Sequence, residues 1–207
     1  MINLFKILFF NLGRILSFLY PKTLSQVIES ILAYTYTGVH ARFFNSWGSY
    51  SSMAWGCRVT NPQYISVGNN NVFLRNTAIT VTPVQPDHSP SVTIGNNCHF
   101  GIRNHLTCIN RIVIGDNLLT GAYVLISDNS HGTIEREILD TAPFDRPLVS
   151  KGGVYIGNNV WIGDKVSILP NVHIGNNVII GANSVVTNDI PDNCVTAGIP
   201  AKIIKQL

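Results

Sequence analysis

An aliphatic residue returns every six positions in the stretch from Val154 to Pro191. A first set of these residues comprises Ile156, Ile162, Ile168, Ile174, Ile180 and Val186. A second set stands four residues after each of them and comprises Val160, Val166, Val172, Val178, Ser184 and Ile190. A period of six fits neither an amphipathic helix nor one long alternating strand, but it does fit a solenoid of short strands joined by tight corners. Three hexads complete one triangular coil, so this stretch predicts two coils with stacked aliphatic interiors.

Glycine, asparagine and aspartate fill the positions between the aliphatic residues, as in the segments IGNN and IGDK. These residue types adopt positive φ or hydrogen-bond their own backbone, as tight corners require. The same spacing begins at Val67 and is interrupted at 83–90 and at 128–153. We therefore expect a solenoid over 67–191 with about five coils. The second interruption predicts a functional loop, because a loop of that length inside a strict repeat adds nothing to the core.

The two ends of the chain lack the six-residue period. Residues 1–40 show two helical patterns, the second opened by Pro21. We interpret residues 41–66, which hold two tryptophans among glycines and serines, as an irregular cap and an imperfect first coil over the open end of the solenoid. Residues 192–207 leave the repeat as a C-terminal tail.

Residues 1–20 are strongly apolar and approach the length of a membrane span. Four polar residues fall on one side of a helical projection, namely Asn3, Lys6, Arg14 and Ser17. This arrangement favours an amphipathic helix over a span, and we find no signal-peptide cleavage pattern. Two interpretations stay open: the helix docks on the solenoid or on a neighbouring subunit, or it lies on the inner face of a membrane.

The charge and the cysteines restrict the function classes further. Only 12% of the residues are charged and the net charge is +3, which gives no basis for nucleic-acid binding. The four cysteines form no CxxC pair, and Cys98 falls on an inward position. Buried free thiols in a reducing cytoplasm are the simplest interpretation, and we expect no structural metal.

The long loop opens with a segment that holds a candidate catalytic residue. The residues Ile126–Gly132 read ISDNSHG and resemble the [I/V]-S-D-x-x-H-G signature of sugar O-acetyltransferases that modify bacterial lipopolysaccharide O-antigen and capsule. Further matches to that group are Arg146-Pro147, VYIGNNVWIG at 154–163, IGANSVV at 180–186 and AGIPAKII at 197–204. The resemblance covers the chain from about Ile94 onward. It implies a mainly β fold, the left-handed parallel β-helix of hexapeptide-repeat acyltransferases, here with a short N-terminal α-helical segment and an extended loop.

The same resemblance implies that His131 is a general base. A sugar hydroxyl attacks a thioester well only as its proton is removed, and neutral imidazole titrates near physiological pH and can take that proton. The oxygen would attack acetyl-CoA directly, because no residue suits an acyl-enzyme intermediate. What orients His131 stays open between Asp128 and a backbone carbonyl.

The resemblance also implies where acetyl-CoA binds. The pantetheine arm of this co-substrate lies in a groove between two solenoids of a homotrimer, because one solenoid supplies only half of that groove. The lysines would meet the nucleotide phosphates, and for the glycines ordinary turn geometry is a sufficient alternative explanation. The matching positions are Trp161, Gly163, Asp164, Gly181, Ala182, Thr187, Asn188, Lys202 and Lys205.

The acceptor site is less constrained. We place Asn104, His105 and Asp128 near the acceptor, with exposure to solvent as the alternative for the first two. His99 and His105 are six residues apart, which we take to stack them on one face. Three convergent histidines would indicate a γ-carbonic-anhydrase-like metal site, but the position of His131 does not match that family's spacing.

These observations predict an acetyl-CoA-dependent O-acetyltransferase acting on a sugar of a surface polysaccharide or its precursor. The alternatives are N-acetylation of an amino sugar nucleotide, a γ-carbonic-anhydrase-like protein and a non-catalytic scaffold. We expect a cytoplasmic protein, with peripheral contact at the inner face of the membrane through residues 1–20.

Overall fold

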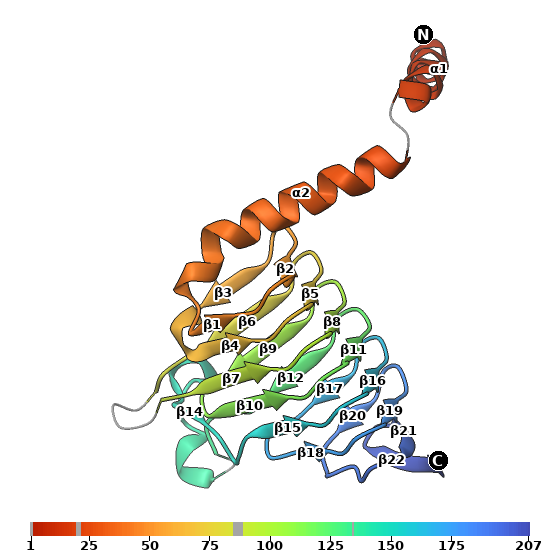
Figure 1. Ribbon diagram of the computed structural model, residues 1–207. Helices are drawn as coiled ribbons and strands as arrows, with labels where there is room; N and C mark the ends of the chain where they lie inside the picture. The colour runs from red at the N-terminus through yellow and green to blue at the C-terminus, as the bar shows by residue number, and fades with distance from the viewer. Residues whose placement is uncertain (1, 20–21, 85–88, 134) are drawn as a thin grey trace.

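A computed structural model describes residues 2–19, 22–84, 89–133 and 135–207 (Figure 1). Short parallel strands wind into a three-sided β-helix, and consecutive strands fall on consecutive sides. Sheet A contains β1 (Ser46–Trp47), β4 (Ile65–Val67), β7 (Ser91–Ile94), β10 (Arg111–Ile114), β15 (Val154–Ile156) and β18 (His173–Ile174). Sheet B contains β2 (Ser52–Met53), β5 (Val72–Phe73), β8 (His99–Phe100), β11 (Leu119–Thr120), β16 (Trp161–Ile162), β19 (Ile179–Ile180), β21 (Cys194–Gly198) and β22 (Ala201–Gln206). Sheet C contains β3 (Arg58–Thr60), β6 (Ala78–Val81), β9 (His105–Cys108), β12 (Leu125–Ser127), β17 (Ser167–Ile168) and β20 (Val185–Val186).

The interior is the aliphatic stack that the six-residue period predicts. Residues such as Ile156, Ile162 and Ile168 are buried on the three successive sides of one coil, and each lies above its equivalent in the next coil. Burial of each such side chain contributes about 1.5–3 kcal/mol. Near the α-helical end the stack becomes aromatic, with the rings of Phe73 and Phe100 parallel and 4.6 Å apart.

The corners between sheets A and B explain the abundance of asparagine. A column of these residues has φ near +60°, a conformation that asparagine tolerates better than most residues. Their side-chain amides also hydrogen-bond from coil to coil over 2.8–3.2 Å. The column consists of Asn70, Asn97, Asn117, Asn159, Asn177 and Asn193.

The solenoid extends beyond the predicted range at both ends. Sheets A and C each hold six strands, so there are six coils rather than about five. The first coil begins at β1, and each of its three strands pairs with the equivalent strand of the second coil, whereas we expected an irregular cap and an imperfect first coil over 41–66. Its strands lack the hexad pattern because aromatic residues and serines replace the aliphatic ones there. At the other end, β21 continues sheet B and β22 folds back antiparallel to it, so residues 192–207 end the sheet with a hairpin.

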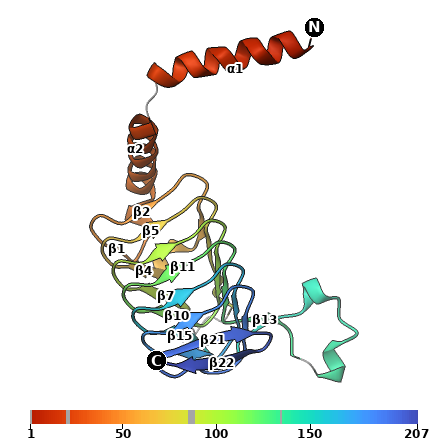
Figure 2. The ribbon, with the colours of Figure 1, turned by 90° about the vertical axis from the view of Figure 1, so that its right-hand side faces the viewer.

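Two helices precede the solenoid, α1 (Ile2–Leu19) and α2 (Lys22–His40). The C-terminal part of α2 covers the open end of the first coil: the Tyr36 hydroxyl donates to the Cys57 carbonyl and Thr37 Oγ1 accepts from the Met53 amide, both over 2.7 Å. The remainder of α2 and all of α1 extend away from the solenoid (Figures 1 and 2). In the part of the chain described here, neither helix is long and apolar enough to cross a membrane.

Candidate active site

The long loop leaves the solenoid at the corner where sheet C passes into sheet A, which we call the loop edge. It starts after β12 and returns at β15, and its base is a two-stranded antiparallel ribbon of β13 (Ser130–His131) and β14 (Leu148–Val149). The Gly132 amide donates to the Pro147 carbonyl over 2.8 Å and extends this ribbon. Two short 3₁₀ turns, Arg136–Ile138 and Pro143–Asp145, shape the tip, which projects far from the solenoid (Figure 2).

The carboxylate of Asp128 fastens the base of this loop to the neighbouring coil. The Asp128 side chain is 0% exposed and accepts hydrogen bonds from the amides of Ile109, Asn110 and Arg111 over 2.8–2.9 Å. The Asn129 side chain adds a fourth donor at 3.0 Å. These bonds occupy both carboxylate oxygens, so Asp128 is an anchor of the fold and not the acceptor-binding group that we predicted.

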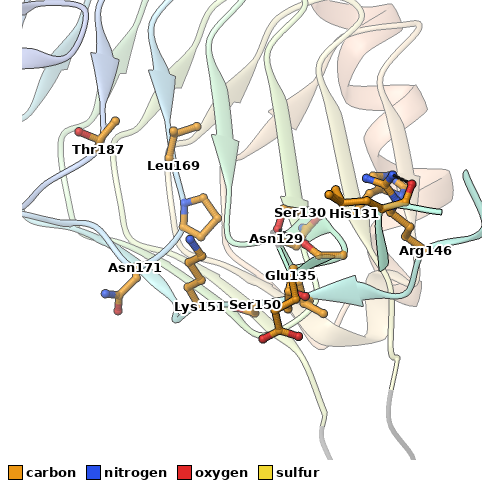
Figure 3. A pocket seen from close by; sticks show the side chains of 15 residues that line it. Asn129, Ser130, His131, Glu135, Arg146, Ser150, Lys151, Leu169, Asn171 and Thr187 are labelled. Carbon is orange, nitrogen blue, oxygen red and sulfur yellow. Dashed lines mark hydrogen bonds between the residues drawn. The ribbon is translucent and has the colours of Figure 1, made fainter. Parts of the chain in front are cut away.

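Against this base lies a cavity of about 1050 Å³, lined both by the loop and by the loop-edge corners of the next coils. Figure 3 shows Thr187 and Leu169 on the solenoid side and His131 and Arg146 on the loop side. The guanidinium of Arg146 donates hydrogen bonds to the carbonyls of Thr141 and Leu139 and thereby stabilises the conformation of the loop. Lys151 and Asn171 also line the cavity.

The His131 side chain is exposed to this cavity. Among the described residues, neither the Asp128 carboxylate nor a backbone carbonyl hydrogen-bonds its imidazole, so neither candidate for orienting it is found within one chain. What fixes the position of His131 here is the backbone, through its pairing with Leu148 in the β13–β14 ribbon. An exposed imidazole whose backbone is held by strand pairing is suited to exchange a proton with a bound molecule.

Six of the nine predicted donor residues fall on two different edges of the prism. Thr187 and Asn188 belong to the loop edge, and Thr187 lines the His131 cavity. Gly163, Asp164, Gly181 and Ala182 instead lie at the corner between sheets B and C, which we call the glycine edge. One chain therefore does not bring the nine predicted positions together.

The close spacing of neighbouring coils explains why most of these residue types stand at the glycine edge. A Cβ on Gly163 would lie 2.6 Å from the amide nitrogen of Ala182, so the next coil leaves room only for glycine. The Asp164 carboxylate accepts a hydrogen bond from the Ala122 amide over 2.7 Å and thereby links its corner to that of the preceding coil. Gly181 is less constrained, because the nearest atom to a Cβ added there would be the Ala197 Cβ, at 3.0 Å.

The remaining donor positions are exposed. Trp161 is 53% exposed in the middle of sheet B and pairs with Leu119, which is 50% exposed. Lys202 and Lys205 project from β22 at the end of the molecule opposite to the helices (Figure 1). Trp161 thus keeps the outward position that the register predicted.

Two predictions about this region are wrong, namely the shared face of His99 and His105 and the outward side chain of Asn104, whereas the assignment of His105 to the acceptor stays a prediction. His99 and His105 do not share a face, because six residues advance the chain by one side of the triangle: His99 is in β8 of sheet B and His105 in β9 of sheet C. Asn104 is 1% exposed, and its side chain bonds Thr120 Oγ1 and the Val124 amide inside the coil. The register contained this signal, because Asn104 stands four residues after Phe100, which is an inward position.

No metal cluster emerges in the described ranges: no three histidine, cysteine or acidic side chains there converge on one point. All four cysteines are buried and free, as predicted. Burial raises the pKa of the Cys57 and Cys98 thiols to about 11, so both are neutral and unreactive packing groups at physiological pH.

Sequence reasoning gave no role to Lys151, Arg146 or Leu169, which all line the His131 cavity. Arg146 was noted only as part of a motif. The available signal was that Lys151 and Arg146 lie within the loop and Leu169 stands at the loop-edge corner of the following coil. Only the winding of the chain brings these three segments to one cavity.

Comparison with known proteins supports the fold. Residues 153–188 match the family model described as bacterial transferase hexapeptide (six repeats). The chain is 41% identical over 105 residues to the "Putative lipopolysaccharide biosynthesis O-acetyl transferase WbbJ" of Escherichia coli K12, covering 49% of this chain and 54% of that protein. It is 36% identical over 130 residues to the galactoside O-acetyltransferase of the same organism, covering 60% and 59%. The chain thus spans between half and three fifths of the length of these two relatives.

Solved structures show the same architecture. The N-acyltransferase AntD from Bacillus cereus, in complex with dTDP and 3-hydroxybutyryl-CoA, has a TM-score of 0.70 at 23% identity, with 84% of this chain and 89% of that chain covered. A hexapeptide-repeat acetyltransferase from Vibrio cholerae, complexed with acetyl coenzyme A, has a TM-score of 0.56 at 20% identity, with coverage of 84% and 77%. The fold of this chain is the left-handed parallel β-helix, as predicted.

Proposed function

We propose that this chain, whose residues 153–188 carry the bacterial transferase hexapeptide repeat, is an acetyl-CoA-dependent O-acetyltransferase. Its acceptor is a hydroxyl of a sugar in a bacterial surface polysaccharide or in a precursor of one. The observation that carries this proposal is the exposed His131 on the β13–β14 ribbon, lining a cavity that Thr187 of the repeat also lines. The names of the two relatives from Escherichia coli point to the same chemistry.

In this mechanism His131 is the general base. Neutral imidazole removes the proton of the sugar hydroxyl as that oxygen attacks the acetyl carbonyl carbon, and a tetrahedral oxyanion forms. When the C–S bond breaks, the imidazolium returns the proton to the departing thiolate of coenzyme A. The proposed attack is direct, without an acyl-enzyme: the four thiols are buried, and the hydroxyls of Ser130 and Ser150 donate to backbone carbonyls and not to His131.

We infer that the functional unit is a homotrimer. The donor residues lie on the loop edge and on the glycine edge, so a groove lined by both sets needs two chains. The loop projects well beyond its own solenoid and can reach a neighbour (Figure 2). Trp161 and Leu119 also give the outer face of sheet B an exposed apolar centre that an adjoining subunit would cover.

The test of this function is transfer of labelled acetyl from acetyl-CoA to glycan fractions of the host. We expect alkali-labile label on a sugar, because an O-acetyl ester hydrolyses in mild base whereas an N-acetyl amide does not. Alkali-stable label would instead indicate N-acetylation of an amino sugar. Absence of transfer to every fraction, with acetyl-CoA binding also absent in calorimetry, would contradict the proposal.

The donor half of the site is checked with the double variant Lys202→Ala/Lys205→Ala. Exposed charges of this kind contribute about 0.2–1 kcal/mol each, so the KM for acetyl-CoA should rise about two- to thirtyfold. The KM for the sugar should stay unchanged, because both lysines lie on β22, away from the His131 cavity. An unchanged KM for acetyl-CoA would remove the lysines from the donor site.

We further propose that residues 1–20 bring the enzyme to a membrane surface. Every described side chain of α1, from Phe5 to Ser17, is exposed, so in this structure α1 does not dock on its own solenoid. Apolar side chains such as Phe9 and Ile15 dominate, and Lys6 and Arg14 are the cations among the described side chains. Burial of an apolar face in the headgroup region, assisted by attraction to anionic lipid, fits this composition.

Liposome sedimentation tests the membrane proposal. Full-length protein should sediment with vesicles that contain anionic lipid, and a variant lacking residues 1–20 should remain in the supernatant. A Lys6→Ala/Arg14→Ala variant should bind less in low salt, since each cation near an anionic surface contributes about 1 kcal/mol. Equal sedimentation of the full-length and shortened proteins would refute this role and favour contact with a neighbouring subunit.

A further inference from the structure

A second hollow lies on the glycine edge, on the coils nearest α2. Its volume is about 800 Å³, and it is formed by the outer face of sheet C together with the corners that precede β3, β6, β9 and β12. In Figure 1 β3 lies directly below α2, whereas β22 lies at the other end of the solenoid. The lining residues are Gly56, Arg58, Thr60, Asn76, Ala78, Thr80, Arg103, Asn104, His105 and Tyr123.

The charge of this hollow has a single sign. Arg58 and Arg103 both line it, and its described lining contains no aspartate or glutamate. Within the described part of the chain, neither guanidinium forms an ion pair with a carboxylate. Two unneutralised guanidinium groups at one concave site attract an oxyanion, because the planar fork of each matches the geometry of phosphate or carboxylate oxygens.

The hollow owes its depth to a small side chain on the outer face of sheet C. Arg58, Ala78 and His105 are in register on adjacent strands, so the small alanine leaves space between the two larger residues. The His105 Nε2 lies 3.1 Å from Thr80 Oγ1. Burial, and secondly the charge of Arg58, lower the pKa of His105, so this ring is neutral at pH 7 and serves as a hydrogen-bonding wall of the hollow.

Two residues of this hollow stand at left-handed corner positions, Arg103 with φ +57° and Tyr123 with φ +60°. Asparagine fills most of the equivalent positions, although Tyr50 and Lys165 adopt the same conformation outside the hollow. Residues other than glycine, asparagine and aspartate adopt this conformation at a cost in free energy, so contacts at the corner must stabilise it. The two strained residues also bond each other, as Arg103 Nη1 donates to the Tyr123 hydroxyl over 2.8 Å. That bond holds the guanidinium at the rim of the hollow.

We propose that this hollow binds the anionic group of the acetyl acceptor, a phosphate or a carboxylate carried by the sugar. The position of the hollow fits the proposed function, on which this assignment to the acceptor rests. With the nucleotide of coenzyme A at Lys202 and Lys205, its arm runs along the glycine edge toward α2. An acceptor must then approach from the α2 side, where the arginines lie.

Calorimetry with two probes tests this assignment and distinguishes the two anion sources. Inorganic pyrophosphate represents a phosphate-linked sugar, and methyl β-D-glucuronide represents an acidic sugar. We expect wild-type protein to bind one of them, and the Arg58→Met/Arg103→Met variant to bind it at least about tenfold more weakly, because charge-assisted hydrogen bonds to both arginines are lost. The control is Arg75→Met, which removes one guanidinium from an exposed corner position outside the lining and should change affinity less than about twofold.

Three results would overturn the proposal. The first is failure of the wild type to bind either probe, and the second is unchanged affinity in the double variant. The third is equal weakening by Arg75→Met, which would indicate non-specific electrostatic attraction of anions to the glycine edge. Titration of acetyl-CoA gives a separate readout, since its affinity should be the same in wild type and double variant. A tenfold loss there would assign the hollow to the phosphates of coenzyme A instead. Anion binding without any acetyl-CoA binding by the wild type would remove the proposed function and, with it, the assignment to an acetyl acceptor.

Discussion

Replacing His131 with alanine should lower kcat for acetyl transfer by about a hundred- to ten-thousand-fold, the range that a positioned general base supplies. The loss should appear in kcat with little change in the KM for acetyl-CoA, because proton removal assists only the transition state. Stability should be unaffected, since the imidazole is exposed and, within the described structure, forms no hydrogen bond. Single-turnover transfer measured with labelled acetyl-CoA, together with a thermal melt, checks both statements.

His173→Ala is the matched control for this experiment. His173 is also an exposed histidine of the solenoid, but it lies on sheet A, where it stacks on Tyr155 with ring centroids 4.6 Å apart. Its removal should leave transfer at the wild-type rate. Wild-type turnover by His131→Ala would eliminate the general-base mechanism, and equal losses in both variants would point to a structural effect.

Replacing Asp128 with alanine should lower the free energy of unfolding by about 3–5 kcal/mol, as expected when a buried charged acceptor is removed from its donors. Three backbone amides, those of Ile109, Asn110 and Arg111, would then lose their acceptor. Transfer should fall as well, because His131 follows three residues later on the loop that this carboxylate anchors. Denaturation in urea followed by circular dichroism measures the first effect.

Asp145→Ala serves as the control for that result. Asp145 is an acidic residue of the same loop, but it is exposed at the tip and should be replaceable with a change of less than about 0.5 kcal/mol. Asp128→Asn should be intermediate, since it keeps the size and one carbonyl acceptor but directs an amide donor toward the backbone amides. A fully stable Asp128→Ala protein would show that water can replace the carboxylate at the loop base.

The period of six made most of the fold predictable. Short strands in a solenoid are stabilised by the residues directly above and below them, so a local repeat carries the information that long-range contacts carry in other folds. Ile156 and its equivalents therefore identified the core, and the same rule placed Cys98 inside. The first coil was predicted only as imperfect, because Trp47 and Met53 stand where most later coils have aliphatic residues, in a part of the chain that packs under α2.

The site was predictable only in part. The motif around His131 identified the candidate base, and the register identified Trp161 as outward. By contrast, the sequence suggested that Asp128 binds the acceptor, whereas its carboxylate accepts hydrogen bonds from three backbone amides that lie 17–19 residues earlier in the chain. The pairing of Arg58 with His105 across the gap at Ala78 links residues far apart in the sequence, and no local pattern announces it.

The sequence by itself determined the three-sided solenoid, its inward residues and the position of the functional loop, because each of these follows from a short periodic pattern and its interruption. The tertiary structure decided which edge each side chain occupies and which polar groups are used up by the fold. Six of the nine predicted donor residues lie on two different edges, Asn104 and Asp128 are buried, and two arginines line one hollow. The physical reason is that neighbours in this fold are about one coil apart in sequence, and the extra residues between β6 and β7 and between β12 and β15 make that distance irregular.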